Sequence, residues 1–154
     1  MASFNKIEIA AEMFVKSHDC YYASGRDIDY IISILLSGAV IGIVSPVLTE
    51  QGGHTTHSLL ARISNFLAEP DEPESKDGMF RATYNGLKHA GNNMGKNKVA
   101  PSADLEIQAD LRLEAARMLD AAKQDFREIE IFQAIKERLP SRFLTLLESE
   151  EHYA

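Results

Sequence analysis

The 154-residue sequence is poor in residues that mark several classes of protein. It has one cysteine, Cys20, and no tryptophan. One cysteine cannot form an internal disulfide, which excludes a disulfide-held scaffold and favours a reducing, cytoplasmic environment. Because Cys20 lies beside two tyrosines in the sequence, we expect a buried and unreactive thiol.

Basic residues are also few: 16 Lys and Arg stand against 23 Asp and Glu, which gives a formal net charge of −7 at pH 7. Such a charge does not favour broad, non-specific binding to nucleic acid or anionic membranes. Any contact with nucleic acid must therefore be local. The sequence also lacks a phosphate-binding glycine loop, a cysteine-based zinc pattern and a Gly-x-Ser-x-Gly motif.

What the sequence does have is one long apolar run, from Tyr30 to Thr49, without a charged residue. The run is long enough to span a membrane. However, Asp27, Asp29 and Glu50 flank it, and no Lys or Arg follows closely enough to set an orientation. It also starts too late, and without a basic leader, for a secretory signal. We therefore expect the most buried helix of a soluble bundle.

Small residues form a strip along this run, since Gly38 and Gly42 are four residues apart and Ser45 follows three later. On a helix these positions share one side, where another helix can approach closely. Together with a long amphipathic helix near the C-terminus, the strip offers more packing surface than a minimal bundle needs. We therefore expect a homodimer.

Apolar residues at steps of three and four predict further helices on both sides of the run. No segment shows the alternation typical of strands. The prediction is an all-α, up-and-down helical bundle of four to five main helices plus a short C-terminal helix. Residues 1–154 form one domain, with a core over about 3–139 and a C-terminal helix and acidic tail over 140–154.

Several helix boundaries follow from capping residues and from glycine and proline. Ser3 is expected to cap the first helix, which Gly25 ends, and a third helix is expected to start near Thr55. The longest amphipathic helix is expected to begin at Pro101 or Ser102, since no glycine or proline interrupts it before residue 140. Residues 69–77 and 92–102 are expected to be exposed loops, the first acidic and the second basic.

Two histidines with metal-ligand spacing, His54 and His57, form an H-x-x-H pattern with Glu50 nearby. Histidines three apart can share a metal ion. The alternative is that both are ordinary residues of a helix start, partly packed under the preceding glycine turn. We assign no metal and no cofactor.

The segment YNGLKHAG, residues 84–91, is the most informative about function. It places Asn85, Lys88 and His89 close together near the end of a short helix. An amide, a cation and an imidazole suit a phosphate or a ribose better than a core. The alternative is a helix C-terminal turn, in which Lys88 and His89 complement the helix dipole.

The order of these elements resembles the HEPN helical-bundle superfamily. A long apolar helix rich in small residues precedes a variable helix, then Asn-x-x-Lys-His, then a long alanine-rich amphipathic helix, over roughly residues 28–129. The resemblance implies a bundle that pairs into a homodimer. In many members it also implies a metal-independent RNase with an arginine followed, after four to six residues, by a histidine.

The resemblance carries over to individual positions only in part. Asn85 and His89 match the motif, whereas Tyr84 stands where arginine is expected and Arg81 is one residue too far upstream. In such a site the histidine acts on the 2′-hydroxyl proton and the arginine steadies the phosphate. The resemblance thus implies catalytic roles for His89 and Asn85, and we expect Arg81 to take the catalytic role of the missing arginine despite its spacing. We expect binding roles for Lys88, Tyr84, Lys96 and Lys98.

Three functions remain open at this point. The first is an HEPN-like RNA- or nucleotide-associated protein, active or degenerate as a metal-independent RNase, of a bacterial or phage conflict system. The second is a non-catalytic helical interaction protein, a phage or operon accessory, that binds another protein through its acidic loop or tail. The third is a helix-borne metal enzyme. The expected partners are a second copy, RNA or a nucleotide, or another protein, and no membrane.

Overall fold

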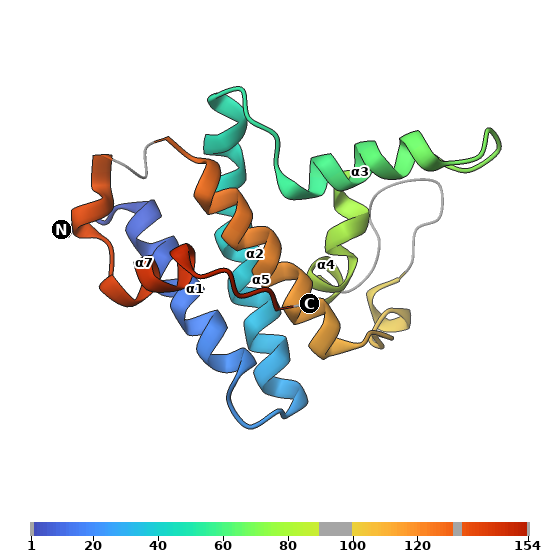
Figure 1. The fold of residues 1–154 in the computed structure, drawn as a ribbon. Coiled ribbons are helices and arrows are strands. Elements are labelled where there is room, and N and C mark those ends of the chain that lie inside the picture. The colour runs from blue at the N-terminus through green and yellow to red at the C-terminus, as the bar shows by residue number, and fades with distance from the viewer. Residues whose placement is uncertain (1, 90–99, 131–133, 154) are drawn as a thin grey trace.

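The computed structural model describes residues 2–89, 100–130 and 134–153. These residues form helices and no strands, so the prediction of an all-α helical bundle is confirmed. The main helices are α1 (Lys6–Tyr21), α2 (Asp27–Glu50), α3 (Thr56–Leu67), α4 (Ala82–Lys88), α5 (Leu111–Glu128) and α7 (Ser141–Glu148). Three short 3-10 turns are η1 (Asp77–Arg81), η2 (Pro101–Ala103) and η3 (Lys136–Arg138). Figure 1 shows α1 and α2 as a hairpin, across which α5 packs.

Helix α2 contains the apolar run and lies at the centre, in contact with α1, α4 and α5. It is long and apolar enough to cross a membrane, a property that it shares with the core helices of soluble proteins. Its side chains Ile34, Val40, Ile41 and Val44 are buried in the core that it shares with α1 and α5. This packing is compatible with a soluble protein.

The small-residue strip on α2 has two different surroundings. A Cβ atom added at Gly38 would lie 2.7 Å from Cγ of the Tyr84 ring, so the missing side chain makes room for Tyr84 of α4. At Gly42 no described atom lies within 4 Å of the same position. The predicted close contact is therefore present at Gly38 and absent at Gly42 in the single chain.

The first helix starts later and ends earlier than its sequence signals indicated. Asn5, not Ser3, is the N-cap of α1, because its side-chain oxygen accepts a hydrogen bond from the Ile7 N–H at 2.8 Å. The helix ends at Tyr21. Gly25 lies in the loop beyond it with φ +71, a conformation that glycine adopts without strain.

Helix α5 begins about ten residues later than expected. The prediction of a start at Pro101 or Ser102 is wrong, because Asp110 caps the helix by accepting from the Leu113 N–H at 3.0 Å. Ile107, which continues the helical period, lies outside the helix, and its Cδ1 would be 3.3 Å from a Cβ added at Gly86. The periodic residues beyond the cap form the buried face of α5: Ala115, Met118, Ala122 and Phe126.

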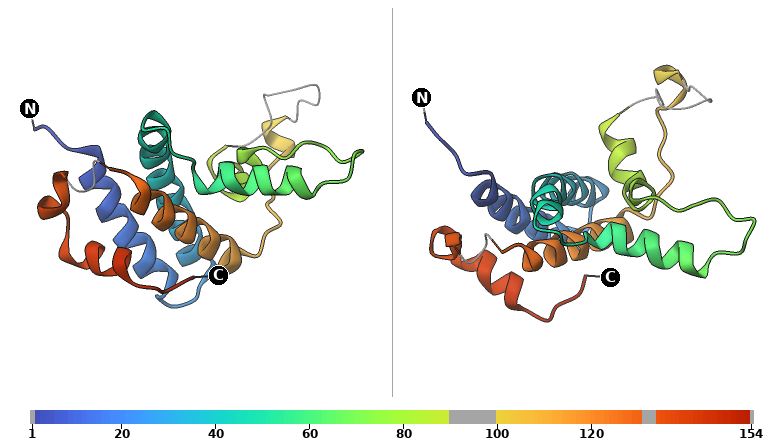
Figure 2. Two further views of the ribbon diagram at one scale, coloured as in Figure 1. Left: turned by 45° about the horizontal axis from the view of Figure 1, so that its top comes forward. Right: turned by 90° about the horizontal axis from the view of Figure 1, so that it is seen from above.

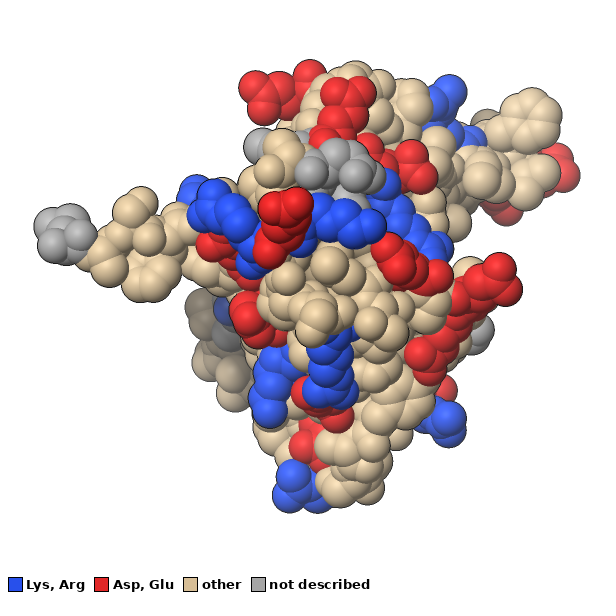
Figure 3. Space-filling model, turned by 60° about the vertical axis from the view of Figure 1, so that its left-hand side comes forward, with Lys and Arg blue, Asp and Glu red and all other residues tan. Residues whose placement is uncertain are grey.

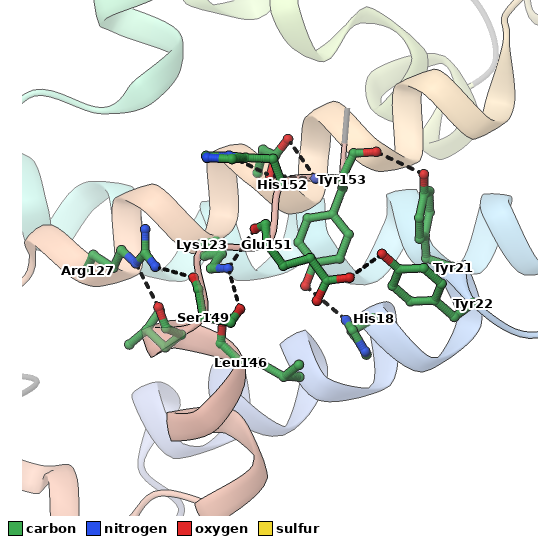
Figure 4. A network of polar contacts seen from close by, with 12 residues as sticks. His18, Tyr21, Tyr22, Lys123, Arg127, Leu146, Ser149, Glu151, His152 and Tyr153 are labelled. Atoms are coloured by element: carbon green, nitrogen blue, oxygen red, sulfur yellow. Dashed lines mark hydrogen bonds and ion pairs between the residues drawn. The ribbon is translucent and has the colours of Figure 1, made fainter.

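The C-terminal part of the chain closes the core on the side of α1 and α5. Phe143 of α7 lies between Phe14 and Phe126, with ring centres 5.8 and 4.7 Å apart. Beyond α7 the tail continues along α5, where Lys123 donates to the Glu151 carbonyl at 2.8 Å (Figure 4). The acidic tail is thus held by hydrogen bonds instead of fraying.

Tyr153 near the end of this tail is buried. Its hydroxyl lies 2.9 Å from His18 Nδ1, its carbonyl accepts from the Tyr21 hydroxyl at 3.0 Å, and its N–H donates to Asp120 at 3.1 Å (Figure 4). The last turn of the tail therefore joins α1 to α5.

Charged side chains on the face formed by the N- and C-terminal parts are mixed in sign, as the space-filling view shows (Figure 3). Ion pairs connect the elements there: Lys136 with Glu148, Arg138 with Glu8, and Arg142 with Asp19. These three cations are therefore paired with acids.

Helix α3 projects away from the bundle, as both views in Figure 2 show. It contacts η1 and the body of α5, and His57 and Ala61 are its buried residues. The chain returns from its outer end to η1 and α4, which lie beside the base of α3 and against α2. The described residues of the predicted site, from Arg81 to His89, lie in this region.

Candidate functional site

The predicted site residues are distributed over η1 and α4: Arg81 ends η1, Tyr84, Asn85 and Lys88 lie on α4, and His89 caps its C-terminal end. Asn85, Lys88 and His89 are exposed. Lys96 and Lys98 lie outside the described residues. The segment therefore has an exposed polar end and, at Arg81, a more enclosed beginning.

Asn85 and His89 lie one helical turn apart at the end of α4, where the His89 N–H donates to the Asn85 carbonyl at 3.1 Å. Lys88 Nζ lies 5.1 Å from the centre of the Tyr84 ring, at cation–π distance. In the part of the chain that the structure describes, no hydrogen bond or ion pair joins Arg81 to either Asn85 or His89. The motif residues thus form two groups.

Tyr84, which the sequence comparison expected to stand in place of an arginine, has a half-buried ring that packs against the backbone of Gly38. A glycine on one helix and an aromatic ring on the other allow close approach of α2 and α4. Tyr84 therefore has a packing role that fixes α4 on the bundle, in addition to its contact with Lys88.

Arg81 lines a pocket of about 470 Å³ between α2, the start of α3 and η1. Its Nε is buried, and among the described residues it has no hydrogen-bond partner. A buried donor is costly to leave unpaired, so an acceptor that reached this nitrogen would be stabilising. The pocket is also lined by hydroxyl groups and by one acid and one imidazole: Ser45, Thr49, Thr55, Asp77 and His57.

His57 is the second functional group in this pocket. Its side chain is buried and stacks on Phe80, with ring centres 6.3 Å apart and planes inclined by 10°. Burial lowers the pKa of His57 below 6.5, and the charge of Arg81 lowers it further, while the carboxylates of Asp125 and Asp77 oppose these effects. The imidazole is therefore neutral at pH 7 and can both donate and accept a hydrogen bond.

Asp125 of α5 fixes the position of His57 by holding the first turn of α3. Its buried carboxylate accepts from the Thr56 N–H and the Thr56 hydroxyl, each at 2.7 Å, and from the Ser45 hydroxyl at 2.9 Å. These bonds join α2, α3 and α5 at one point. A carboxylate at a helix N-terminus is also favoured by the helix dipole.

A second pocket, of about 480 Å³, is lined by His57 and Phe80 as well. Its other walls combine apolar residues with carboxylates, including Leu60, Met79, Glu114 and Asp120. A flat, partly polar group could stack on Phe80 and donate hydrogen bonds to these carboxylates. His57 lines both pockets and so lies between them.

The H-x-x-H pattern does not bring its two histidines together on one ligand. His54 is exposed, with its Nε2 3.2 Å from Arg62 Nη1, whereas His57 is buried against Phe80. Among the described residues no three His, Cys, Asp or Glu side chains lie close enough together to hold a metal ion.

Searches of protein-family models, curated proteins and solved structures find no match to this chain.

Sequence reasoning proposed Arg81 as a site residue but gave His57 a packing role as the alternative to a metal ligand. It did not identify Asp125 at all. Its place in the first turn of a helix indicated that His57 could be packed. No local feature of the sequence indicated that His57 lies near Arg81.

Proposed function

We propose that this chain is an HEPN-like RNA- or nucleotide-associated protein that binds a phosphate group beside Arg81. The observation that supports the proposal is the buried Nε of Arg81, which has no hydrogen-bond partner among the described residues and belongs to a side chain that lines one pocket together with the neutral His57. A guanidinium donates readily to phosphate oxygens. The neutral imidazole and the hydroxyls of the pocket suit a sugar hydroxyl next to that phosphate.

The exposed end of α4 extends this surface. Lys88 supplies positive charge there, and Asn85 and His89 offer an amide and an imidazole at the same end. If RNA is cleaved, His89, which matches the motif, takes the 2′-hydroxyl proton, and Arg81 steadies the phosphate in place of the missing motif arginine. Binding therefore depends on Arg81, and cleavage depends additionally on His89.

The first prediction concerns Arg81→Ala and the binding of a short single-stranded RNA, measured by fluorescence anisotropy without divalent metal. We expect Kd to rise about tenfold and the slope of log K against log salt to fall by about one phosphate contact. The matched control is Arg138→Ala, which removes the same charge from a residue paired with Glu8 away from the pocket.

Equal weakening by both variants would assign the effect to net charge and contradict the Arg81 site. The same RNA, followed by gel electrophoresis, tests cleavage: His89→Ala should abolish it while Kd stays near that of the parent. If the parent protein does not bind RNA at low salt, the proposal fails, and the non-catalytic interaction protein takes its place.

A further inference from the structure

Helix α3 has an apolar face that no other described segment covers. The helix projects from the bundle (Figure 2), and Phe66 and Leu67 near its outer end are 87% and 72% exposed. Together with Leu59 and Ile63 they line a shallow groove of about 700 Å³. Exposed apolar patches of this kind mark interaction sites in soluble proteins. The face belongs neither to the bundle core nor to the Arg81 pocket.

The polar side of the same helix, in contrast, has its partner within the chain. Asn65 accepts from the Ser75 N–H at 2.6 Å and donates to the Ser75 carbonyl at 3.0 Å, and the hydroxyls of Ser64 and Ser75 lie 2.8 Å apart. The returning chain thus runs along the polar side and leaves the apolar side outward. A 12-residue helix is marginal without tertiary packing, so covering this face would stabilise it.

Acidic side chains border the apolar face at the base of α3. Leu59 also lines a neighbouring pocket of about 470 Å³, whose other walls include Glu128 and Glu130. Both glutamates are exposed, and among the described residues neither forms an ion pair with a Lys or Arg. A positive charge that entered this pocket would therefore be attracted by both carboxylates beside the apolar groove.

The outer end of α3 is acidic as well. The loop that follows the helix holds four exposed carboxylates: Glu69, Asp71, Glu72 and Glu74. The opposing charges are Arg62, which lines the groove, and Lys76, which follows the acidic loop. Acids thus outnumber bases around the face, and the apolar residues lie between two groups of carboxylates.

This arrangement of charges identifies the kind of partner. Two copies of this chain that paired through α3 would bring carboxylates together in either direction, because both ends of the face are acidic. An anionic membrane surface would be repelled for the same reason. A partner that carries positive charge at both ends of an apolar stretch is instead attracted at each end.

The spacing of the apolar residues fits a helical partner. Leu59, Ile63 and Phe66 recur at steps of four and three, and a helix face of this kind packs against the side-chain ridges of a second helix. At about 1.5 Å per residue, the stretch from Leu59 to Leu67 is roughly 12 Å long, or about two turns. The partner's apolar residues therefore extend over about two turns, with Lys or Arg in the turn before and the turn after.

We infer that α3 docks a basic amphipathic helix of another protein. The apolar stripe of that helix covers Ile63 and its neighbours, and its Lys or Arg side chains reach the carboxylates at the two ends of α3. The contact is at the small end of specific interfaces, so the binding is weak and decreases with added salt. The docking face contains neither Arg81 nor His89, and the inference does not depend on RNA binding.

A synthetic peptide tests the docking. The probe is a fluorescein-labelled, alanine-based helix of about 16 residues, with leucines at steps of three and four in its middle and lysines at both ends. Fluorescence anisotropy at low salt should show binding to the full chain, and Ile63→Ser should raise Kd at least about tenfold. Ile28→Ser is the matched control and should leave Kd unchanged, since Ile28 is exposed to 50% and Ile63 to 56%, and Ile28 lies at the start of α2.

The contribution of the charges is measured with the same probe. The double variant Glu128→Gln and Glu130→Gln should raise Kd about threefold at low salt and flatten its salt dependence. Glu12→Gln with Glu150→Gln is the matched control, because these two glutamates are also exposed and lie on α1 and in the C-terminal tail. A peptide with glutamates in place of its lysines should not bind.

A parent protein that does not bind the lysine peptide, or that binds it equally well after Ile63→Ser, would overturn the inference. Equal binding of the lysine and glutamate peptides would overturn it too. Self-association of the parent that Ile63→Ser abolishes in sedimentation would assign the face to a second copy instead. Cosedimentation with phosphatidylcholine vesicles that the same variant abolishes would assign the face to a lipid surface.

Discussion

At the scale of single residues, the two glycines of α2 have opposite roles, although they have the same place in the sequence pattern. Gly38→Ala should lower the free energy of unfolding by about 1–3 kcal/mol, because the new Cβ would overlap the Tyr84 ring. Gly42→Ala should raise it by about 0.5–1 kcal/mol, since alanine favours a helix and nothing described lies within 4 Å. Urea unfolding followed by circular dichroism measures both.

Each glycine variant serves as the control for the other, because both make the same substitution in the interior of one helix. A Gly38→Ala protein as stable as Gly42→Ala would show that Tyr84 does not rest on Gly38. A large loss at Gly42 would instead indicate a contact with a second copy there, which is the packing that the sequence pattern predicted.

At the scale of elements, the base of α3 depends on one carboxylate from α5. Asp125→Ala leaves the Thr56 N–H and the Ser45 hydroxyl without their acceptor, which should cost about 2–4 kcal/mol. The loss of stability should first affect α3, which Asp125 holds in place. Amide hydrogen exchange should therefore accelerate in α3 more than in α1 or α2.

Asp110→Ala provides the control, since Asp110 is also a carboxylate that accepts from a backbone N–H at a helix start. It caps α5 and is exposed, so its loss should cost about 1 kcal/mol and leave α3 unchanged. If exchange in α3 responds equally to both variants, Asp125 has no special role in anchoring α3.

At the scale of the whole molecule, two histidines in different parts of the fold act in the same direction on stability. Burial lowers the pKa of both His18, which lies beside Tyr153 (Figure 4), and His57 below 6.5. The unfolded chain therefore binds more protons than the native protein between the lowered values and 6.5. Stability should rise with pH in this window and reach its plateau above it.

Thermal unfolding between about pH 5 and pH 7 measures this dependence, and the double variant His18→Gln and His57→Gln should reduce its slope. Hydrogen bonds from Arg26 and Ser24 lower the pKa of Asp29 to about 2. The contribution of Asp29 to stability is present above pH 4 and is lost as the pH falls toward 2. It therefore does not overlap the pH range in which the two histidines titrate. An unchanged slope in the double variant would contradict the prediction.

The sequence by itself determined the fold class and the central helix. Apolar residues at helical spacing and an uncharged run from Tyr30 to Thr49 depend only on local order, and so they predicted an all-α bundle around α2 correctly. Boundaries were less secure, because a single capping hydrogen bond, such as that of Asp110, outweighs a periodic pattern that continues past it. The HEPN resemblance and RNA binding stay predictions.

Only the tertiary structure decided which residues share a site. His54 and His57 have ligand spacing, yet the place where α3 meets α5 turns His57 into the core and His54 to the surface. The same junction places His57 in the pocket of Arg81, which no spacing along the chain could show. The reason is physical: helical period fixes the face on which a side chain lies, whereas the crossing of helices fixes what that face meets.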